Sequence, residues 1–472
     1  MKNRYPRNMS GYGIDCPEVV WPFNSRIAVQ FVVNYEEGGE NNILHGDQGS
    51  EAFLSEIIGA TSWRGQRHWN MESIYEYGSK AGFWRLARIF QKANIKPTVF
   101  GVATALARSP EQVAAMNYMD WEIASHGLKW IEHKDMSISE ERKQIKEAIK
   151  LHKEVTGKEP SGWYTGRCSM NTVDLVSSEK IFKYISDAYD DDLPYWRFHN
   201  NFDQLIIPYS LDVNDMRFAS TQGFNSGDQF FTYLKDTFDC LYSEGCDGQA
   251  KIMNVGLHCR LAGRPGRAQA LSKFIDYCRN HEKVWFPKRV EIADFWEKNN
   301  PPTHFSRPSQ MDKSEFLNAF GGIFENSRWV AEQAFELELG PAHDTAIGIH
   351  GALSRSFRSG TRKERLEVLK AHPDLAGKLL VSNNLTKAST SEQESAGLDK
   401  LSEKEFAIFS NLNKKYFEKH RFPFIIAVRD YDKSGILSSF RDRLENETEL
   451  EFDEACSQVE RIAYIRLQDI LP

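Results

Sequence analysis

The stretch from Ile27 to Gly38, I-A-V-Q-F-V-V-N-Y-E-E-G, decides how most of this chain is interpreted. Residues 27–33 are mostly apolar and β-branched, which is typical of a fully buried strand in a parallel sheet. The run leads directly into Glu36 and Glu37 and then two glycines. Acidic residues at the end of a buried strand are typical of the C-terminal face of a barrel enzyme. On this stretch alone, a solvated turn with two surface glutamates is an equal alternative.

Further apolar runs follow along the first three hundred residues, separated by a long polar loop at 39–70 and by segments with helical spacing, such as 77–91. A capping box, Ser137 with Glu140, begins one predicted helix, and Gly157 ends it. Strands that alternate with helices indicate a parallel α/β fold, and polar residues after the strands favour a barrel over an open sheet. The predicted strands after the first are 97–102, 121–124, 162–165, 184–189, 205–209, 252–258 and 284–286.

Length and composition limit the class of protein. A chain of 472 residues exceeds the size at which one core keeps growing, so we expect two domains. The net charge is −7 without a basic block, which argues against nucleic acid and anionic membranes as partners. The seven cysteines are scattered and include no C-x-x-C, which favours reduced thiols. Because no apolar run is long enough to span a membrane and no signal-peptide pattern opens the chain, we expect a soluble, cytoplasmic protein.

The polar residues that follow the predicted strands suggest a chemistry. Glu36 and Glu37 are followed along the chain by His126, Arg167, Asp190–Asp192 and His258. One histidine after an apolar strand is usually structural, but two histidines with carboxylates and an arginine are a set that hydrolysis can use. A carboxylate can activate water, a histidine can protonate the leaving nitrogen, and cations can stabilise the developing negative charge. No Gly-rich phosphate loop is present, so nucleotide use is not indicated.

Residues 10–298, approximately, resemble the polysaccharide deacetylase (NodB-like) superfamily. The resemblance lies in the order of five motifs: N-Y-E-E-G, S-H-G, G-W-Y-T-G-R, D-D-L-P-Y-W and L-H. This segment resembles most the metal-independent allantoinases of that superfamily, also called PuuE-type. The resemblance implies an α/β fold, a deformed (β/α) barrel, that hydrolyses the hydantoin ring of allantoin to allantoate. It also implies a site with two catalytic residues and three that bind substrate. These are Glu36 and His126 for catalysis, and Glu37, Arg167 and His258 for binding.

The metal-dependent deacetylases hold a divalent metal with one aspartate and two histidines. In this chain the aspartate position is Glu37, the first histidine is His126, and the position four residues on is Trp130. Two candidate ligands remain where a catalytic zinc site expects three, and His133 would need a different geometry. We therefore predict a site without metal and without any cofactor. A metal-dependent deacetylase or amidohydrolase is the alternative, which chelation would test.

Beyond the first domain, residues 301–312 are rich in proline and poor in apolar side chains, and we predict an interdomain linker there. Residues 313–472 show helical patterns only, which predicts an all-α domain. Ser402 and Glu405 form a capping box, with Phe406, Phe409, Leu412, Tyr416 and Phe417 following at helical spacing. Residues 452–471 form another amphipathic helix.

Two residues of the predicted helical domain are unusual. Pro373 ends the preceding helix and holds His372 at a helix junction, although a lone histidine there is more often structural than catalytic. Arg466 falls on an apolar stripe that runs from Val459 to Ile470, whereas Arg461 falls on the polar side of the same helix. An arginine on an apolar face needs an anion, either a structural carboxylate or a bound ligand.

Four motifs in order resemble the OHCU (2-oxo-4-hydroxy-4-carboxy-5-ureidoimidazoline) decarboxylase family over about residues 316–471. They are H-P-D-L-A-G-K, L-T-x-x-S-x-x-E-Q-x-x-A-G-L-D, F-P-F-I-I-A-V-R and R-I-A-x-x-R-L. Ala388 departs from the glutamate that is common at its position. The resemblance implies decarboxylation of OHCU to (S)-allantoin and CO2. It implies His372 and Glu392 as catalytic residues, and it places substrate binding at Ser389, Ile425, Ile426, Ala427 and Arg466.

The two resemblances support each other, because the product of the second reaction is the substrate of the first. We therefore predict a bifunctional enzyme of urate degradation that acts on two small molecules, OHCU and allantoin. We expect a homo-oligomer, with neither nucleic acid nor membrane as partner. The alternative makes the helical domain a non-catalytic assembly module. The presence of His372, Glu392 and Arg466 together argues against that alternative, because a scaffold needs none of them.

Overall fold

The computed structural model describes residues 7, 9, 11–12, 16–199, 202–302, 307–372, 375 and 402–471. The chain divides into two compact units, of which one is Tyr12–Thr303 and the other is His304–Pro472 together with Met1–Gly11. The boundary lies within the predicted linker. All seven cysteines are free. Among the described residues, no helix combines the length and the apolar character needed to span a bilayer.

The described strands of the first unit form one curled sheet of nine strands, in the order β6-β7-β5-β4-β3-β2-β1-β8, with β9 paired to β1. All pairs are parallel except the hairpin of β6 and β7. The sheet is a half-barrel with helices outside, so the predicted deformed barrel is confirmed. The strands are β1 Ile27–Tyr35, β2 Thr98–Gly101, β3 Glu122–Ser125, β4 Gly162–Trp163, β5 Tyr184–Ile185, β6 Tyr195–His199, β7 Phe202–Ile206, β8 Lys251–His258 and β9 Val284–Trp285.

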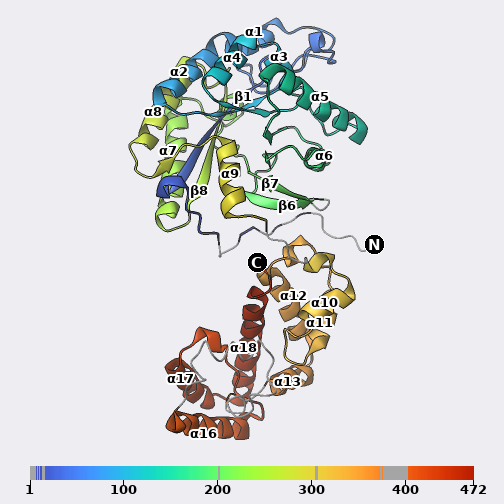
Figure 1. Cartoon of the computed structure of the whole chain (residues 1–472), viewed down its shortest axis with the longest axis vertical. Helices are drawn as coiled ribbons and strands as arrows, with labels where there is room; N and C mark the ends of the chain where they lie inside the picture. Colours follow the sequence, from blue (N-terminus) through green and yellow to red (C-terminus); the bar gives the residue numbers. More distant parts are fainter. Residues whose placement is uncertain are drawn as a thin grey trace. The chain divides into compact units, whose positions relative to one another are not determined.

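Helices cover the outer face of this sheet, with α2, α8 and α7 packed next to one another and α5 beside α3, α4 and α6 (Figure 1). The predicted caps of α5 are present, because Ser137 accepts from the third backbone N–H and Gly157 adopts a φ of 80°. The helices are α1 Trp69–Tyr77, α2 Phe83–Ala93, α3 Ala103–Ala107, α4 Pro110–Tyr118, α5 Ile138–Thr156, α6 Thr172–Ser178, α7 Gly227–Cys246, α8 Pro265–Arg279 and α9 Arg289–Asn299.

Strand β1 lies at the centre of the unit, and every one of its residues is buried. Val29, Phe31 and Val33 belong to the apolar cluster under α2 and α8, whereas Ala28 and Val32 belong to a second cluster on the opposite face. Both faces of the strand are therefore apolar, which explains why the sequence shows a continuous run rather than alternation. The strand ends at Tyr35, so the two glutamates stand at the C-terminal edge of the sheet.

A buried side chain links the segment after β7 to β1 and β8. Arg289, the first residue of α9, is completely buried. Its Nη2 donates to the carbonyl oxygens of Ile207 (2.6 Å) and Pro208 (2.5 Å), just beyond β7. Its Nη1 donates to the side chains of Gln30 on β1 (3.1 Å) and Asn254 on β8. The guanidinium thus adds to the backbone hydrogen bonds that already link β8 to Asp192 and Val213.

Two parts of the first unit differ from the prediction. The hairpin strand β6 was not predicted, and its partner β7 begins and ends three residues earlier than the predicted strand at 205–209. The helix predicted over 77–91 begins too late and is not uniform: α1 starts at Trp69 and ends at Tyr77, a π-helical turn follows at Gly78–Gly82, and α2 continues from Phe83. Gly82 packs against the carbonyl of Cys259, where a Cβ would lie 1.9 Å from the oxygen. This close approach to the segment after β8 requires glycine.

The second unit is helical, with no strand among its described residues, as predicted. Helix α16 begins at the predicted capping box, and α18 packs against α12, α13 and α16. Two predicted apolar positions are wrong, because Phe417 and Ile470 are 51% and 48% exposed. The last residues of the predicted linker fold with this unit, since Ser309 hydrogen-bonds Asp344 through its backbone and its hydroxyl, both at 2.8 Å. The helices are α10 Lys313–Phe320, α11 Arg328–Phe335, α12 Ala346–Ser359, α13 Arg362–Ala371, α16 Glu403–His420, α17 Lys433–Leu444 and α18 Thr448–Gln468.

Candidate functional site

In the first unit, three predicted site residues meet at the C-terminal edge of the sheet. Glu36 follows β1, His126 follows β3, and His258 ends β8. The Oε1 atom of Glu36 lies 3.3 Å from Nε2 of His126 and 3.4 Å from Nε2 of His258. None of the three residues is more than 4% exposed. Parallel strands of one sheet therefore place one carboxylate between two imidazoles, as the positions at the strand ends predict.

Asp215, which the sequence analysis did not identify, orients His258. Its carboxylate accepts a hydrogen bond from Nδ1 of His258 at 2.6 Å and others from the backbone N–H groups of His258 (2.7 Å) and Ala262 (2.8 Å). Both ring nitrogens of His258 thus face carboxylates. Burial lowers the pKa of His258, but the charges and hydrogen bonds of Glu36 and Asp215 raise it to about 9. His258 therefore carries a proton at neutral pH.

Arg260 is a second site residue that the sequence analysis did not identify. Its Nη2 donates to Oε2 of Glu36 at 2.7 Å, so it contacts the carboxylate oxygen opposite the histidines. Burial raises the pKa of Glu36, but Arg260, His258 and His126 together hold it well below its usual range. Glu36 is consequently ionised. The only sequence signal for Arg260 is its place two residues after His258.

Glu37 is buried beside Glu36 and turns toward the π-helical turn. Its Oε1 accepts from the backbone N–H of Arg260 at 3.2 Å and its Oε2 from that of Glu36 at 3.1 Å. Burial raises the pKa of Glu37, an effect that Arg260 opposes and Glu36 reinforces. The carboxylate packs directly on Gly78, where a Cβ would lie 2.3 Å from Oε1. Any residue larger than glycine at position 78 would therefore displace the Glu37 carboxylate.

Arg167 lies with the loop at 39–70 rather than with Glu36. Its guanidinium carbon is 3.7 Å from the centroid of the Trp130 ring, and its Nη1 is 3.5 Å from Glu51 of that loop. Its Nε and Nη2 are buried without a hydrogen-bond partner among the described residues. The loop also covers the carboxylates, because the carbonyl of Leu54 accepts from Nε of Arg260 at 2.9 Å. The polar loop at 39–70 therefore packs over the candidate site.

The expected carboxylates at 190–192 take structural hydrogen bonds instead, with Asp190 accepting from the hydroxyl of Tyr195 and Asp191 from the backbone of Leu193. Besides Glu36, a second acid that interacts with His126 is Asp187, whose carboxylate accepts from two backbone N–H groups after β4. Burial raises the pKa of Asp187, and His126 is among the groups that lower it.

The residues weighed as metal ligands do not converge in this unit. His133 hydrogen-bonds Glu141 at 3.1 Å, and Trp130 packs its ring under Arg167. Glu37 and His126 remain as donors. Across the described residues of the whole chain, no group of three or more His, Cys, Asp and Glu side chains is placed to hold a metal ion.

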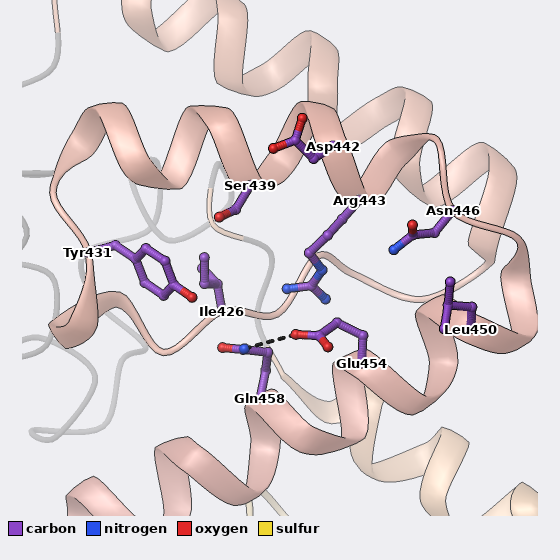
Figure 2. Close-up of a pocket in the computed structure, with 9 residues that line it drawn as sticks. All are labelled: Ile426, Tyr431, Ser439, Asp442, Arg443, Asn446, Leu450, Glu454 and Gln458. Atoms are coloured by element: carbon purple, nitrogen blue, oxygen red, sulfur yellow. Dashed lines mark hydrogen bonds between the residues drawn. The ribbon is translucent and has the colours of Figure 1, made fainter.

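In the second unit, a cavity of about 310 Å³ lies between α17 and α18 (Figure 2). Gln458 of α18 accepts from the backbone N–H of Ala427 at 2.9 Å and donates to Glu454 at 3.0 Å. The first of these bonds attaches the predicted binding segment Ile425–Ala427 to α18, and the second orients the Gln458 side chain within the helix. The described residues that line the cavity are Ile426, Tyr431, Ser439, Asp442, Arg443, Asn446, Leu450, Glu454 and Gln458.

The same segment is fixed from its other side by an ion pair that the sequence analysis did not identify. Arg443 donates to the carbonyl of Ile425 at 2.8 Å and to the buried carboxylate of Glu451 at 2.6 and 2.9 Å. Tyr416 donates to that carboxylate as well. Three helices thus hold the backbone of Ile425–Ala427 through a saturated polar network, which favours one conformation of the segment.

His372 and Arg466 are both buried but are not among the described residues that line the cavity. The ring of His372 donates through Nδ1 to the carbonyl of Val368 at 2.8 Å, as a residue at a helix end would. Arg466 donates to the carboxylate of Glu325 at 2.9 Å. The anion that an arginine on an apolar stripe needs is thus supplied here by a protein carboxylate. Arg461 pairs with Asp430 at the surface, as its polar side predicts. Two other predicted site residues, Ser389 and Glu392, lie outside the described residues.

Comparison with known proteins relates each unit to a family. The polysaccharide deacetylase family model matches residues 71–178, and the OHCU decarboxylase model matches residues 309–468. A Schizosaccharomyces pombe protein named for polysaccharide deacetylase is 40% identical over 300 residues, which cover 60% of this chain and 93% of that protein. The OHCU decarboxylase of Halalkalicoccus jeotgali is 34% identical over 162 residues, covering 34% of this chain and 88% of that enzyme. The chain belongs to both families.

A solved structure extends the first relation. The crystal structure titled PuuE allantoinase shares 52% identity with this chain at a TM-score of 0.63, covering 63% of this chain and 99% of that one. The polysaccharide deacetylase-like domain is therefore similar in fold to that structure. The OHCU decarboxylase domain follows in the same chain, as the sequence analysis predicts.

Proposed function

We propose that the chain is a bifunctional enzyme of urate degradation. The OHCU decarboxylase domain converts OHCU to (S)-allantoin and CO2, and the deacetylase-like domain hydrolyses allantoin to allantoate. The observation that carries the proposal is the 52% identity to PuuE allantoinase over nearly the whole of that protein. Its fusion to a decarboxylase domain whose product would be allantoin gives independent support.

The geometry around Glu36 supports hydrolysis of a cyclic amide. The ionised carboxylate takes a proton from water, and the water oxygen bonds to the ring carbonyl carbon. The ring C–N bond then breaks, and the leaving nitrogen takes a proton from a histidine. The sequence-based prediction gave catalysis to His126 and binding to His258. The raised pKa of His258, about 9, favours His258 as the proton donor, with His126 holding Glu36 in place.

The proton can then return within the site. When His258 loses its proton to the leaving nitrogen, Glu36 loses one of the positive charges that depress its pKa. Its affinity for the proton taken from water rises at that moment. Since Oε1 of Glu36 lies 3.4 Å from Nε2 of His258, the proton can pass back and restore the starting state. Arg167 and Glu37 bind the substrate in this proposal.

We further propose that hydrolysis needs no metal, because the position of a third ligand is taken by Trp130, whose ring packs against Arg167, and because Glu37 accepts from the backbone N–H of Arg260. Activity should survive prolonged chelation. Glu36→Gln should abolish allantoin hydrolysis and leave decarboxylation unchanged. A stoichiometric metal whose removal abolishes hydrolysis would return the domain to the metal-dependent class.

For decarboxylation we propose the residues of the resemblance: His372 and Glu392 move protons, while Ser389, Arg466 and the backbone of Ile425–Ala427 bind OHCU. Loss of CO2 leaves an electron pair on the ring carbon, which the ring delocalises until a proton is delivered to one face. The Arg443 network supports this role, because it fixes the carbonyl of Ile425 without using a ligand.

One experiment tests both activities together. The purified chain receives freshly generated OHCU, and allantoin and allantoate are followed over time, with the optical activity of the allantoin recorded. We expect (S)-allantoin to rise and then fall as allantoate accumulates. Accumulation of allantoin at the spontaneous rate and as a racemate would reject the decarboxylase. Stable (S)-allantoin without allantoate would reject the hydrolase alone.

A further inference from the structure

Arg260 is held in place by several contacts in the first unit. It is completely buried, and its Nε and Nη2 donate to Leu54 and Glu36. Its guanidinium carbon lies 4.3 Å from the centroid of the Tyr75 ring. Contacts with a loop, a strand end and a helix therefore fix the plane of the guanidinium. A group fixed in this way can act on a reacting atom without having to reorganise.

The remaining nitrogen of Arg260, Nη1, has no hydrogen-bond partner among the described residues and is shielded from solvent. Its nearest ionic neighbour is Oε1 of Glu37 at 3.7 Å, which is an ion-pair contact but too long for a hydrogen bond. Buried polar groups are nearly always paired in native proteins, so an unpaired charged donor beside the reacting carboxylate calls for an acceptor.

Arg167 has the same property, and the two arginines share one neighbour. Nε and Nη2 of Arg167 are buried without a described partner. The guanidinium carbons of Arg167 and Arg260 lie 3.7 and 5.3 Å from the centroid of the Trp130 ring. Unpaired donors from two guanidiniums thus gather around one indole. A planar ligand with several carbonyl oxygens, such as a hydantoin, matches this set in shape and in hydrogen bonding.

We propose that Arg260 is a catalytic residue whose Nη1 donates to the scissile carbonyl oxygen, while Arg167 binds a second carbonyl of the same substrate. This inference rests on the proposed hydrolysis of allantoin. As water adds to the carbonyl carbon and Glu36 takes the water proton, the C=O electron pair moves to the oxygen that faces Arg260. The pair then returns, the C–N bond breaks, and the nitrogen takes its proton from His258.

The test is Arg260→Lys in the full chain. Lysine retains a positive charge beside Glu36 but cannot present a second, fixed donor to the substrate. We expect kcat for allantoin hydrolysis to fall by about 10²–10³, the usual effect of removing one oxyanion donor. The KM should change less than about threefold, and decarboxylation by the other domain should stay at the wild-type rate. Arg267→Lys is the matched control, because Arg267 pairs with Glu56 near the surface, and it should have little effect.

The outcomes separate this inference from the proposed function. Inactive wild-type enzyme would reject allantoin hydrolysis itself. Active wild type with Arg260→Lys within about threefold in kcat would overturn the role of Arg260. A loss that is recovered at higher pH would also overturn it, because Arg260 would then serve only to keep Glu36 ionised. Rates are divided by the folded fraction of the domain, and Arg260→Gln is a second variant if lysine prevents folding.

Discussion

Replacement of Gly78 by alanine tests how closely the π-helical turn holds the carboxylate of Glu37. Gly78 has helical angles, φ −57° and ψ −47°, so helix propensity alone predicts that alanine stabilises the domain by about 1 kcal/mol. The surroundings predict the opposite. The new Cβ would lie 2.3 Å from Oε1 and 2.7 Å from Cγ of Glu37, which no relaxation of the helix backbone alone can relieve.

The cost follows from what Glu37 must give up when it moves. Its carboxylate would lose the hydrogen bonds from the backbone N–H groups of Arg260 (3.2 Å) and Glu36 (3.1 Å). Each hydrogen bond contributes about 0.5–1.5 kcal/mol, and overpacking adds about 1–3 kcal/mol. Partial relaxation and the propensity gain offset some of this. We expect Gly78→Ala to lower the free energy of unfolding of the domain by roughly 2–5 kcal/mol.

The matched control is Gly351→Ala in α12, where an added Cβ meets nothing within 4 Å and the helix should gain about 1 kcal/mol. Calorimetry of each full-length variant gives the two transitions, which are assigned by following the loss of each activity on heating. Gly78→Ala should lower the transition of the hydrolase by several degrees and reduce allantoin turnover at least tenfold. If Gly78→Ala and wild type have equal stability and turnover, neither property depends on the present position of the Glu37 carboxylate.

The remaining predictions concern His258, Arg466 and the linker. The pKa of His258 is raised from 6.5 to about 9, so the contribution of its charge to the stability of the folded domain is complete below pH 6.5 and is lost as the pH rises through 9. In a pH–rate profile, kcat/KM for allantoin should fall across the same alkaline range. If Arg466 binds OHCU, Arg466→Lys should lower kcat/KM for decarboxylation by a factor of about 10–10³ with little change in Tm. If Arg466 only forms a structural pair with Glu325, the same substitution should lower Tm and leave kcat/KM nearly unchanged. Arg461→Lys, at the surface, should change neither property. Expressed separately, the pieces on either side of residues 301–312 should each retain one activity, and loss of both in the pieces would mean that the sites are not self-contained.

The sequence predicted the parts of the fold that depend on local pattern. A β-branched run such as Ile27–Val33 can be satisfied only by burial, and a capping box such as Ser137 with Glu140 is a local event. The π-helical turn was missed because the helical periodicity continues on both of its sides. It is specified by Gly78 and Gly82 meeting Glu37 and Cys259, contacts that no local pattern contains.

The site was predictable to the extent that strand ends meet in space. Glu36, His126 and His258 each end or follow a strand of one parallel sheet, so their convergence follows from the topology. Asp215 and Arg260 lie in connections, and their partners are set by loop conformation rather than by strand order. In the decarboxylase domain, the backbone segment at Ile425–Ala427 was predicted, but the side chains that hold it come from two later helices.

The bridge made by Arg289 has a consequence for the order of events at the ribosome. This side chain contacts Asn254 of β8 and the carbonyl of Pro208 beyond β7, yet it belongs to the first residue of α9, near the end of the deacetylase-like domain. The nascent domain can form its strands and the direct hydrogen bond from Asn254 to Pro208 while about 290 residues emerge, but the four hydrogen bonds of the guanidinium to these segments and Gln30 form only after Arg289 leaves the exit tunnel. The decarboxylase domain is synthesised immediately afterwards. Formation of these hydrogen bonds and the start of the second domain are therefore neighbouring events in translation.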